Sequence, residues 1–284
     1  MGKGAGWESG LGLGLGLLIG WLGYRRGLLS RSGITAITVA SVLGFSTGGW
    51  VWGGLFLIVF VSSGLWSCYR SAKGSVAERS RGTVRRDWSQ VVAGTGWAAV
   101  LALLHLLAPG VTGTFAAFVG ALATTNADVW STELGMLSSR APRVITSRRP
   151  VAAGTPGAVS TLGIVAALAG AWLVGLMGLL FVVIQAWSRD VAWDRALLWL
   201  PIAATAGGTV GSLVDSLLGA TAQGIYYCDR CETETDQRVH SCGKVARQVR
   251  GWAWLTNDGI DLVSSIVGAA VAAGVLSSLA QTGV

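Results

Sequence analysis

The segment VSTLGIVAALAGAWLVGLMGLLFVVIQ, residues 159–185, has no charged side chain and exceeds the roughly 20 residues that a helix needs to cross a bilayer. Other long apolar runs occur along the 284-residue chain, separated by short basic stretches. Only 12% of the residues are charged, against about 25% in an average soluble domain, and 52% are hydrophobic. This composition excludes a water-soluble fold and predicts a polytopic membrane protein.

The apolar runs are expected to be helices, because a membrane-spanning backbone must satisfy its own hydrogen bonds and these runs lack period-two alternation. We therefore predict an all-α helix bundle that forms one integral membrane domain over residues 1–284. The predicted spans are 9–24, 34–48, 50–67, 88–108, 112–132, 159–185, 196–221 and 259–280. The second and third meet at residues 46–49, which form either a tight turn or a break in one helix, so seven spans are the alternative.

The basic residues predict the orientation. Eighteen of the 21 Lys and Arg residues fall in four loops, residues 24–33, 69–87, 138–158 and 222–258. With eight spans these loops share one face, which the positive-inside rule makes cytoplasmic, and both termini lie on the opposite side. The positive charge is therefore interpreted as a topology signal, and we expect no nucleic-acid partner.

Five acidic residues lie near the predicted cytoplasmic ends of spans. An acid at the centre of a span costs roughly 2.5 to 3.5 kcal/mol on insertion scales, so each acid in such a segment needs an explanation. Asp128 and Glu133 end the fifth span, Asp215 lies near the end of the seventh, and Asp258 and Asp261 begin the eighth. Any single one can cap a helix or pair with a loop arginine, but together the five indicate a functional site.

Oxygen ligands without nearby sulfur suit Mg²⁺, which usually takes one or two carboxylates together with substrate phosphates. In a helix Asp258 and Asp261 share a face, whereas Asp128 and Glu133, five residues apart, do not. Either the helix unwinds before residue 135 or Glu133 has a separate role. Further oxygen donors accompany the acids at Asn126, Ser131, Ser212, Ser216, Asn257 and Ser264.

The stretch PRVITSRRPVAAGTPGAVS, residues 142–160, is the best candidate for anion binding. It combines guanidinium groups with a Gly- and Pro-containing backbone whose N–H groups are expected to be free. It leads into the N-terminus of the sixth span, where the helix dipole favours phosphate. An ordinary basic loop is the alternative. The candidate ligands are Arg143, Arg148, Arg149, Gly154, Thr155, Gly157 and Ser160.

The loop 222–258 contains Cys228, Cys231, His240 and Cys242, with the spacing C-x2-C-x8-H-x-C. A reducing cytosol argues against disulfides, and the C-x2-C half is a common zinc half-site. The single residue between His240 and Cys242 is atypical, so unliganded thiols are the alternative to a structural zinc ion. In either case these side chains would stabilise a loop and perform no chemistry.

Four segments resemble the integral-membrane phytyl-phosphate kinase family, which includes the plant enzyme of tocopherol synthesis and prokaryotic relatives. They are ATTNADVWSTELG (123–135), PRVITSRRPVAAGTPGAVS (142–160), GSLVDSLLGATAQ (211–223) and WLTNDGIDLVSSIVGA (254–269). The segment RRDWSQVVAGTG (85–96) resembles a further block of that family. The paired cysteines resemble only some prokaryotic members, so we expect no catalytic role for them.

The resemblance implies a kinase that uses CTP, GTP or ATP to convert a prenyl monophosphate, such as phytyl or geranylgeranyl phosphate, into the diphosphate. Together with the topology above, it implies a prokaryotic plasma-membrane protein with its active site facing the cytoplasm. On this interpretation Asp128, Asp215, Asp258 and Asp261 hold Mg²⁺, and Glu133 and Asn257 orient ligands or water. Arg86 and Gln90 would close the site, and the arginines and amides of 142–160 would hold phosphates.

Two other classes fit parts of the pattern. A transporter or flippase for an anionic or polyprenyl-phosphate-linked substrate would also carry intramembrane acids and glycine-interrupted helices. It would need those acids near the membrane midplane, whereas here they are expected at one face. A purely structural membrane protein leaves the five acids and the arginine-rich loop unexplained.

Overall fold

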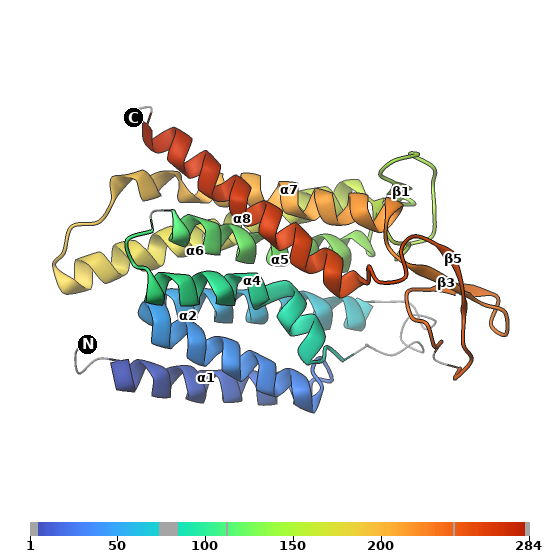
Figure 1. Ribbon diagram of the computed structural model, residues 1–284, viewed down its shortest axis with the longest axis horizontal. Coiled ribbons are helices and arrows are strands. Elements are labelled where there is room, and N and C mark those ends of the chain that lie inside the picture. The colour runs from blue at the N-terminus through green and yellow to red at the C-terminus, as the bar shows by residue number, and fades with distance from the viewer. Residues whose placement is uncertain (1–4, 74–84, 112, 241, 282–284) are drawn as a thin grey trace.

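The computed structural model describes residues 5–73, 85–111, 113–240 and 242–281, which form a mostly helical protein (Figure 1). Five helical stretches of this described part are long and apolar enough to cross a membrane: α2, α4, α6, α7 with the turn before it, and α8. The helices are α1 (Ala5–Arg25), α2 (Arg31–Lys73), α4 (Trp88–Leu107), α5 (Thr114–Gly135), α6 (Thr161–Arg189), α7 (Leu200–Thr221), α8 (Asn257–Gln281) and the 3₁₀ helix η1 (Arg195–Trp199).

Helix α2 contains the break that the sequence predicts around residues 46–49. Gly49 has φ 70° and ψ −161°, a conformation that is essentially restricted to glycine. A β-carbon placed on Gly44 would lie 2.9 Å from the α-carbon of Gly53, although nine residues of straight helix span about 13 Å. The chain therefore turns back at Gly49, and α2 consists of two helical segments packed against each other.

Helix α5 occupies the centre of the bundle, against α2, α4, α6, α7 and α8. Its side chains Phe118, Val119 and Leu122 are fully buried. Glycines let the surrounding helices approach closely: a β-carbon on Gly207 of α7 would overlap the carbonyl oxygen of Gly268 in α8. This packing places the polar ends of α5, α7 and α8 beside one another.

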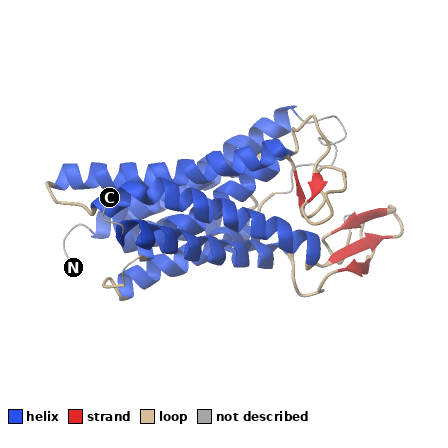
Figure 2. Ribbon diagram, turned by 90° about the horizontal axis from the view of Figure 1, so that it is seen from above, coloured by secondary structure: helices blue, strands red, loops and turns tan. Residues whose placement is uncertain are grey.

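Two small antiparallel sheets lie at one end of the bundle (Figure 2). Strand β1 (Arg143–Val144) pairs with β2 (Ala158–Val159) in the connection between α5 and α6. Strand β3 (Ile225–Cys228) lies between β4 (Thr233–Thr235) and β5 (Arg247–Arg250) in the connection between α7 and α8. The expectation of a purely helical fold is corrected here, since strands of two to four residues are too short to show a period-two pattern.

The connections that the sequence marks as basic lie at the end with the sheets. The connections from α1 to α2, from α5 to α6 and from α7 to α8 are all found there, while α1 begins and α8 ends at the opposite end (Figure 1). The backbone of Arg86, just before α4, pairs with Leu29 after α1, which places the start of α4 at the same end. Arg79 and Arg81 of the second basic loop lie outside the described residues.

Candidate functional site

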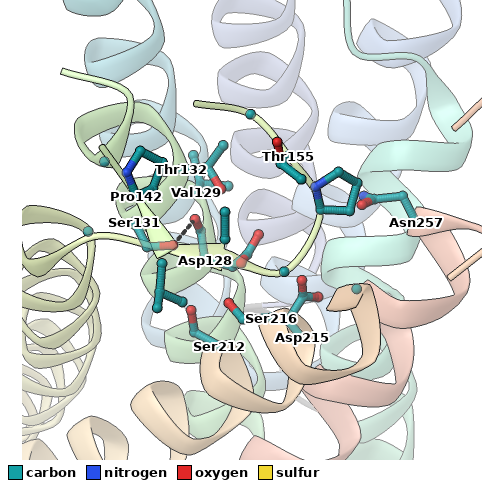
Figure 3. Close-up of a pocket in the computed structure, with 18 of the residues that line it drawn as sticks. Asp128, Val129, Ser131, Thr132, Pro142, Thr155, Ser212, Asp215, Ser216 and Asn257 are labelled. Carbon is teal, nitrogen blue, oxygen red and sulfur yellow. Dashed lines mark hydrogen bonds between the residues drawn. The ribbon is translucent and has the colours of Figure 1, made fainter. Parts of the chain in front are cut away.

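A cavity of about 880 Å³ lies at the sheet end of the bundle, between α5, α7, α8 and the connection before α6. Its wall includes Asp128, Asp215 and Asp261, one acid from each of the three helices. Figure 3 shows Asp128 and Asp215 directed into a common space, with Thr155 and Asn257 at its edge. Three of the acids that the sequence indicates therefore come together in one cavity, and Glu133 lies elsewhere in its wall.

The three carboxylates are close enough to share a cation. Each offers one oxygen, and these oxygens lie within 4.8 Å of one another. Two unit negative charges at that separation repel by roughly 3.5 kcal/mol at an effective dielectric constant of about 20. Ser264 donates a hydrogen bond to Asp215 Oδ2 at 3.2 Å, and Asn257 donates one to Asp261 Oδ2 at 3.3 Å, but both donors are neutral. A divalent cation would neutralise the cluster, and a ligand set made only of oxygens suits Mg²⁺.

Asp258, which we expected among the metal ligands, is not one of the described residues that line this cavity. It lies in the first turn of α8, where the helix dipole stabilises an acid without any metal. Asp261 begins the next turn, deeper in the bundle, and reaches the cluster. Asp258 and Asp261 therefore lie on the same helix, but only Asp261 lines the cavity.

Glu133 forms a buried ion pair outside the carboxylate cluster. Its side chain is 8% exposed and accepts hydrogen bonds from Ser67 Oγ at 2.5 Å and from Nε of Arg70. Arg86 Nη2 lies 3.9 Å from Glu133 Oε1. Because α5 continues through residue 135 without unwinding, the five-residue spacing directs Glu133 toward α2 and away from Asp128. The sequence left open whether the helix unwinds before residue 135 or Glu133 has a separate role. The structure supports a separate role for Glu133.

The arginines of residues 142–160 are not where we expected them. Arg143, Arg148 and Arg149 are exposed and are absent from the described lining of the cavity. The pairing of β1 with β2 leaves these three side chains on the outer part of the connection, where Arg143 Nη1 donates to the Arg148 carbonyl at 3.1 Å. Among the described residues, the arginine that lines the cavity is Arg86.

The inner part of the same connection, residues 152–160, does line the cavity. Gly157 has φ 75°, and a β-carbon there would overlap the backbone nitrogen of Ala220, so the connection lies directly against α7. The N–H groups of Thr155 and Ala158 donate to carbonyls within the connection. These two amides are therefore occupied, and the expectation of generally free N–H groups is too broad.

The N-terminus of α6 faces the cavity. Ser160 has extended backbone angles and caps the helix, with its Oγ accepting a hydrogen bond from the Gly163 N–H at 3.0 Å. Both residues line the cavity. The partial positive charge of the first helical turn is therefore presented to any anion bound there.

The remaining predicted residues divide into cavity wall and helix packing. Asn126 is fully buried, accepting from Ser62 Oγ at 2.7 Å and donating to the Gly170 carbonyl at 2.8 Å, so it joins α5 to α2 and α6 and does not reach a ligand. Gln90 lines the cavity and also forms the capping box of α4 with Asp87. Other predicted residues in the wall are Ser131, Gly154, Thr155, Gly157, Ser160, Ser212, Ser216, Asn257 and Ser264.

Sequence reasoning missed Thr209 and strand β4 as parts of this wall. The hydroxyl of Thr209 in α7 is buried without a hydrogen-bond partner among the described residues, which makes it available to a ligand or water. Residues 233–236, which include Glu234 and Asp236, line the mouth. No sequence signal identifies them, because their position depends on how the sheet docks against the bundle.

A second cavity, of about 300 Å³, adjoins the first. Apolar side chains from α1, both halves of α2 and α4 contribute to its wall, among them Ile19, Ile37, Phe60 and Val91. The hydroxyl of Ser63 in this wall is buried and lacks a partner within the described part of the chain. The residues common to both cavities are Arg86, Gln90, Gly94, Thr125 and Glu133.

A separate cluster of ligand-type side chains lies in the three-stranded sheet. Cys228, Cys231, His240 and Cys242 each offer an atom, and these atoms lie within 4.8 Å of one another. The hydrogen bond with His240 lowers the pKa of the Cys242 thiol to about 6, and the hydrogen bond with Cys242 raises the pKa of Cys231 to about 11. Cys242 is therefore the thiol of this pair that ionises first.

Comparison with known proteins identifies relatives over most of the chain. The family model described as Integral membrane protein DUF92 matches residues 14–269. The chain is 34% identical to Protein PGR of Arabidopsis thaliana over 265 residues, which cover 88% of this chain and 90% of that protein. It is 37% identical over 103 residues to an uncharacterised membrane protein of Methanocaldococcus jannaschii, covering 36% of this chain and 38% of the relative. No solved structure matches the chain. The chain therefore belongs to the DUF92 family of integral membrane proteins.

Proposed function

We propose that this protein is a Mg²⁺-dependent kinase that transfers a phosphoryl group from a nucleoside triphosphate to a prenyl monophosphate. The observation that carries the proposal is the meeting of Asp128, Asp215 and Asp261 in a cavity that adjoins a second cavity with apolar walls. The three acids come from sequence blocks that resemble the phytyl-phosphate kinase family. The same arrangement supplies a charged site and an apolar site side by side, as the two substrates require.

The carboxylate cluster has the composition of a magnesium site and a spacing that is only slightly wider. Two oxygens bound to one Mg²⁺ at about 2.1 Å lie at most about 4.2 Å apart, so small rotations of side chains that are now within 4.8 Å bring them into range. Asp128, Asp215 and Asp261 would hold the ion. When bound, it would neutralise charge on the phosphates of the nucleotide.

The nucleotide phosphates are assigned to the wall formed by residues 152–160 and the first turn of α6. The helix dipole and the exposed amides of a helix N-terminus favour phosphate. The unpartnered hydroxyl of Thr209 lies in the same wall and offers a hydrogen bond. This placement needs no contribution from Arg143, Arg148 or Arg149.

The prenyl monophosphate is assigned to the junction of the two cavities. Its tail would begin in the apolar cavity between α1, α2 and α4. Its phosphate would lie at Arg86, which lines both cavities and is held 3.9 Å from Glu133. The tail would then extend toward lipid, and the phosphate would face the nucleotide.

In the proposed reaction an oxygen of the prenyl monophosphate attacks the γ-phosphorus of the nucleotide. The bond between that phosphorus and the oxygen bridging to the β-phosphorus breaks, and the nucleoside diphosphate leaves with that oxygen. The acceptor phosphate is already ionised at neutral pH, so the reaction needs positioning and charge neutralisation more than a general base. Arg86 and the α6 N-terminus would provide both.

We also propose that all eight helical segments, counting the halves of α2 separately, cross the prokaryotic plasma membrane. The described basic residues of the loops gather at the sheet end, which the positive-inside rule assigns to the cytoplasm. Both ends of the chain would then face outward. Nucleoside triphosphates are available on the cytoplasmic side, where this orientation places the cavity.

The position of the acids favours a kinase over a transporter. Asp128 and Asp215 lie seven and six residues before the ends of α5 and α7, and Asp261 lies four residues after the start of α8. At 1.5 Å per residue, each acid is within about 10 Å of the sheet end of its helix. A transporter site near the midplane of a bilayer with a core of about 30 Å would lie deeper.

The direct test is to incubate detergent-purified protein with labelled CTP, GTP or ATP, Mg²⁺ and a panel of prenyl monophosphates. We expect label from the γ-phosphate in a prenyl diphosphate, and no product when EDTA removes the metal. Parallel reactions with prenyl alcohols control for phosphorylation of the wrong acceptor. If no monophosphate and nucleotide pair gives labelled diphosphate, the proposed activity is wrong.

A further inference from the structure

The side chains of Cys228, Cys231, His240 and Cys242 come from the tips of two turns that face each other. Cys228 ends β3, and Cys231 lies in the turn to β4. His240 and Cys242 lie in a second turn, closed by the antiparallel bridge between Val239 and Val245. In zinc knuckles, two turns likewise contribute two metal ligands each.

The spacing of the ligand atoms fits a tetrahedral metal ion and not a disulfide. Cys228 Sγ and Cys242 Sγ are 3.6 Å apart. Two sulfurs bound tetrahedrally to zinc at about 2.3 Å lie about 3.8 Å apart, whereas a disulfide needs about 2.05 Å. All four ligand atoms lie within 4.8 Å of one another, so one ion can contact every one of them after small adjustments.

The sheet has only a small apolar core of its own. Its buried cluster consists of Tyr226, Cys228 and Ala246, with Cys242 packed against it. Small modules with so few buried side chains are usually stabilised by disulfides or a metal ion. Two of the four side chains in this small core are themselves candidate ligands.

We propose that Cys228, Cys231, His240 and Cys242 bind one structural zinc ion, and that this ion fixes strand β4 at the mouth of the large cavity. The set is complete with four protein ligands, which is typical of structural zinc and leaves no open position for catalysis. Soft sulfur ligands select zinc over the Mg²⁺ assigned to the oxygen cluster. The zinc content and the stability of the sheet can be measured whether or not the protein has kinase activity.

The connection from zinc to the cavity runs through strand pairing. Cys228 is the register partner of Thr233, and Tyr227 is the partner of Glu234. Thr233 and Glu234 in turn line the cavity mouth. An ion that fixes Cys228 therefore fixes the two residues that form this part of the wall.

The first test measures zinc and free thiols in protein purified with a phosphine reductant and without added metal. We expect about one zinc per chain. Cys231→Ser should lose it, and because Cys231 is exposed, that loss is not due to a disturbed core. Cys68→Ser, which removes the cysteine of α2, is the matched control and should keep it. Four free thiols without zinc would overturn the proposal.

The fourth ligand is tested by paired substitutions at His240. His240→Ala should lose zinc during dialysis against a mild chelator, while His240→Cys should retain it because a four-sulfur set also binds zinc. Cobalt substitution gives an independent readout, since thiolate-bound tetrahedral Co²⁺ has strong charge-transfer absorption. Equal zinc retention by both variants would exclude His240 as a ligand and would overturn the four-ligand site.

The structural consequence is tested by hydrogen exchange on the wild-type protein, which avoids variants that fail to fold. Removing zinc with a strong chelator should speed amide exchange in β3, β4 and β5 and leave the helices α5 and α6 protected. Restoring zinc should restore the slow exchange. If exchange in the sheet is unaffected when zinc leaves, the ion does not hold β4 in place.

Discussion

Single positions within a helical turn decide which acids reach the carboxylate cluster. Asp258 and Asp261 are separated by three residues of α8, yet only Asp261 joins Asp128 and Asp215 in the cluster. The difference is depth, because Asp258 lies in the terminal turn and Asp261 in the next one. Sequence spacing identified the right helix and face, but it does not tell how deep the cavity lies.

The Asp cluster makes a prediction about activity. Asp128→Asn and Asp215→Asn each remove a negative charge with little change in volume. We expect prenyl-diphosphate formation to fall about 100- to 1,000-fold, the usual effect of deleting one electrostatic contact at a reacting group. Initial rates at saturating nucleotide measure it. Asp258→Asn is the matched control and should stay close to wild type, and an equal loss in that variant would place Asp258 in the metal site.

The Glu133 ion pair makes a prediction about stability. Glu133→Gln leaves the charge of Arg70 without its partner. Breaking a buried pair costs about 3–5 kcal/mol, and we expect the lower end because the Arg70 side chain is 26% exposed. The midpoint of thermal unfolding in detergent should therefore drop clearly. Arg143→Gln, at an exposed arginine, is the control and should leave the midpoint unchanged. A similar midpoint for both variants would show that the pair does not hold α5 to α2.

The arginines show where residue-level reasoning reaches its limit. Charge and glycine content selected residues 142–160 as an anion-binding candidate, and residues 152–160 line the cavity. The pairing of β1 with β2 decides which half faces inward, and two-residue strands leave no pattern to detect. The cavity arginine, Arg86, was predicted in a lesser role because its contacts to Leu29 and Glu133 join segments far apart in sequence.

At the scale of elements, the helices could be predicted and the strands could not. Long apolar runs fix the helices within a few residues, and the Ser-Thr-Gly-Gly sequence located the turn in α2. Strands β3 to β5 total eleven residues and depend on the turns that carry the cysteines and His240. The sequence indicated the four ligand-type side chains but not the sheet that carries them.

Close helix packing predicts opposite effects for two glycines of α8. A β-carbon on Gly268 would overlap Thr124 Oγ1 of α5, while one on Gly274 meets nothing within 4 Å. Gly268→Ala should destabilise the protein by about 1–3 kcal/mol through overpacking. Gly274→Ala should be neutral or stabilising by up to about 1 kcal/mol, because alanine is the better helix former. Unfolding midpoints measure both, and equal midpoints would contradict the close contact of α5 with α8.

At the scale of the whole molecule, the two ends of the helix bundle carry different groups of polar and charged side chains. The sheets, the acid cavity and the cysteine cluster all lie at one end, and the described basic connections lie there as well. The opposite end carries the ion pair of Arg189 with Glu8, which joins α6 to α1. The proposed nucleotide chemistry and the proposed zinc site both require the first of these ends to face the cytoplasm.

This orientation is tested with two single cysteines at exposed positions. Ser147→Cys lies in the connection between α5 and α6 at the sheet end, and Ala192→Cys lies between α6 and α7 at the opposite end. In intact cells a membrane-impermeant maleimide should label Ala192→Cys above the parent chain, because that connection faces outward. Ser147→Cys should gain label only after the membrane is permeabilised, and inverted vesicles should reverse the pattern. Labelling of Ser147→Cys in intact cells would place the cavity on the outside of the cell, where neither nucleoside triphosphates nor zinc-bound thiolates would be expected. This result would contradict the proposed topology, the proposed kinase activity and the reducing environment of the proposed zinc site together.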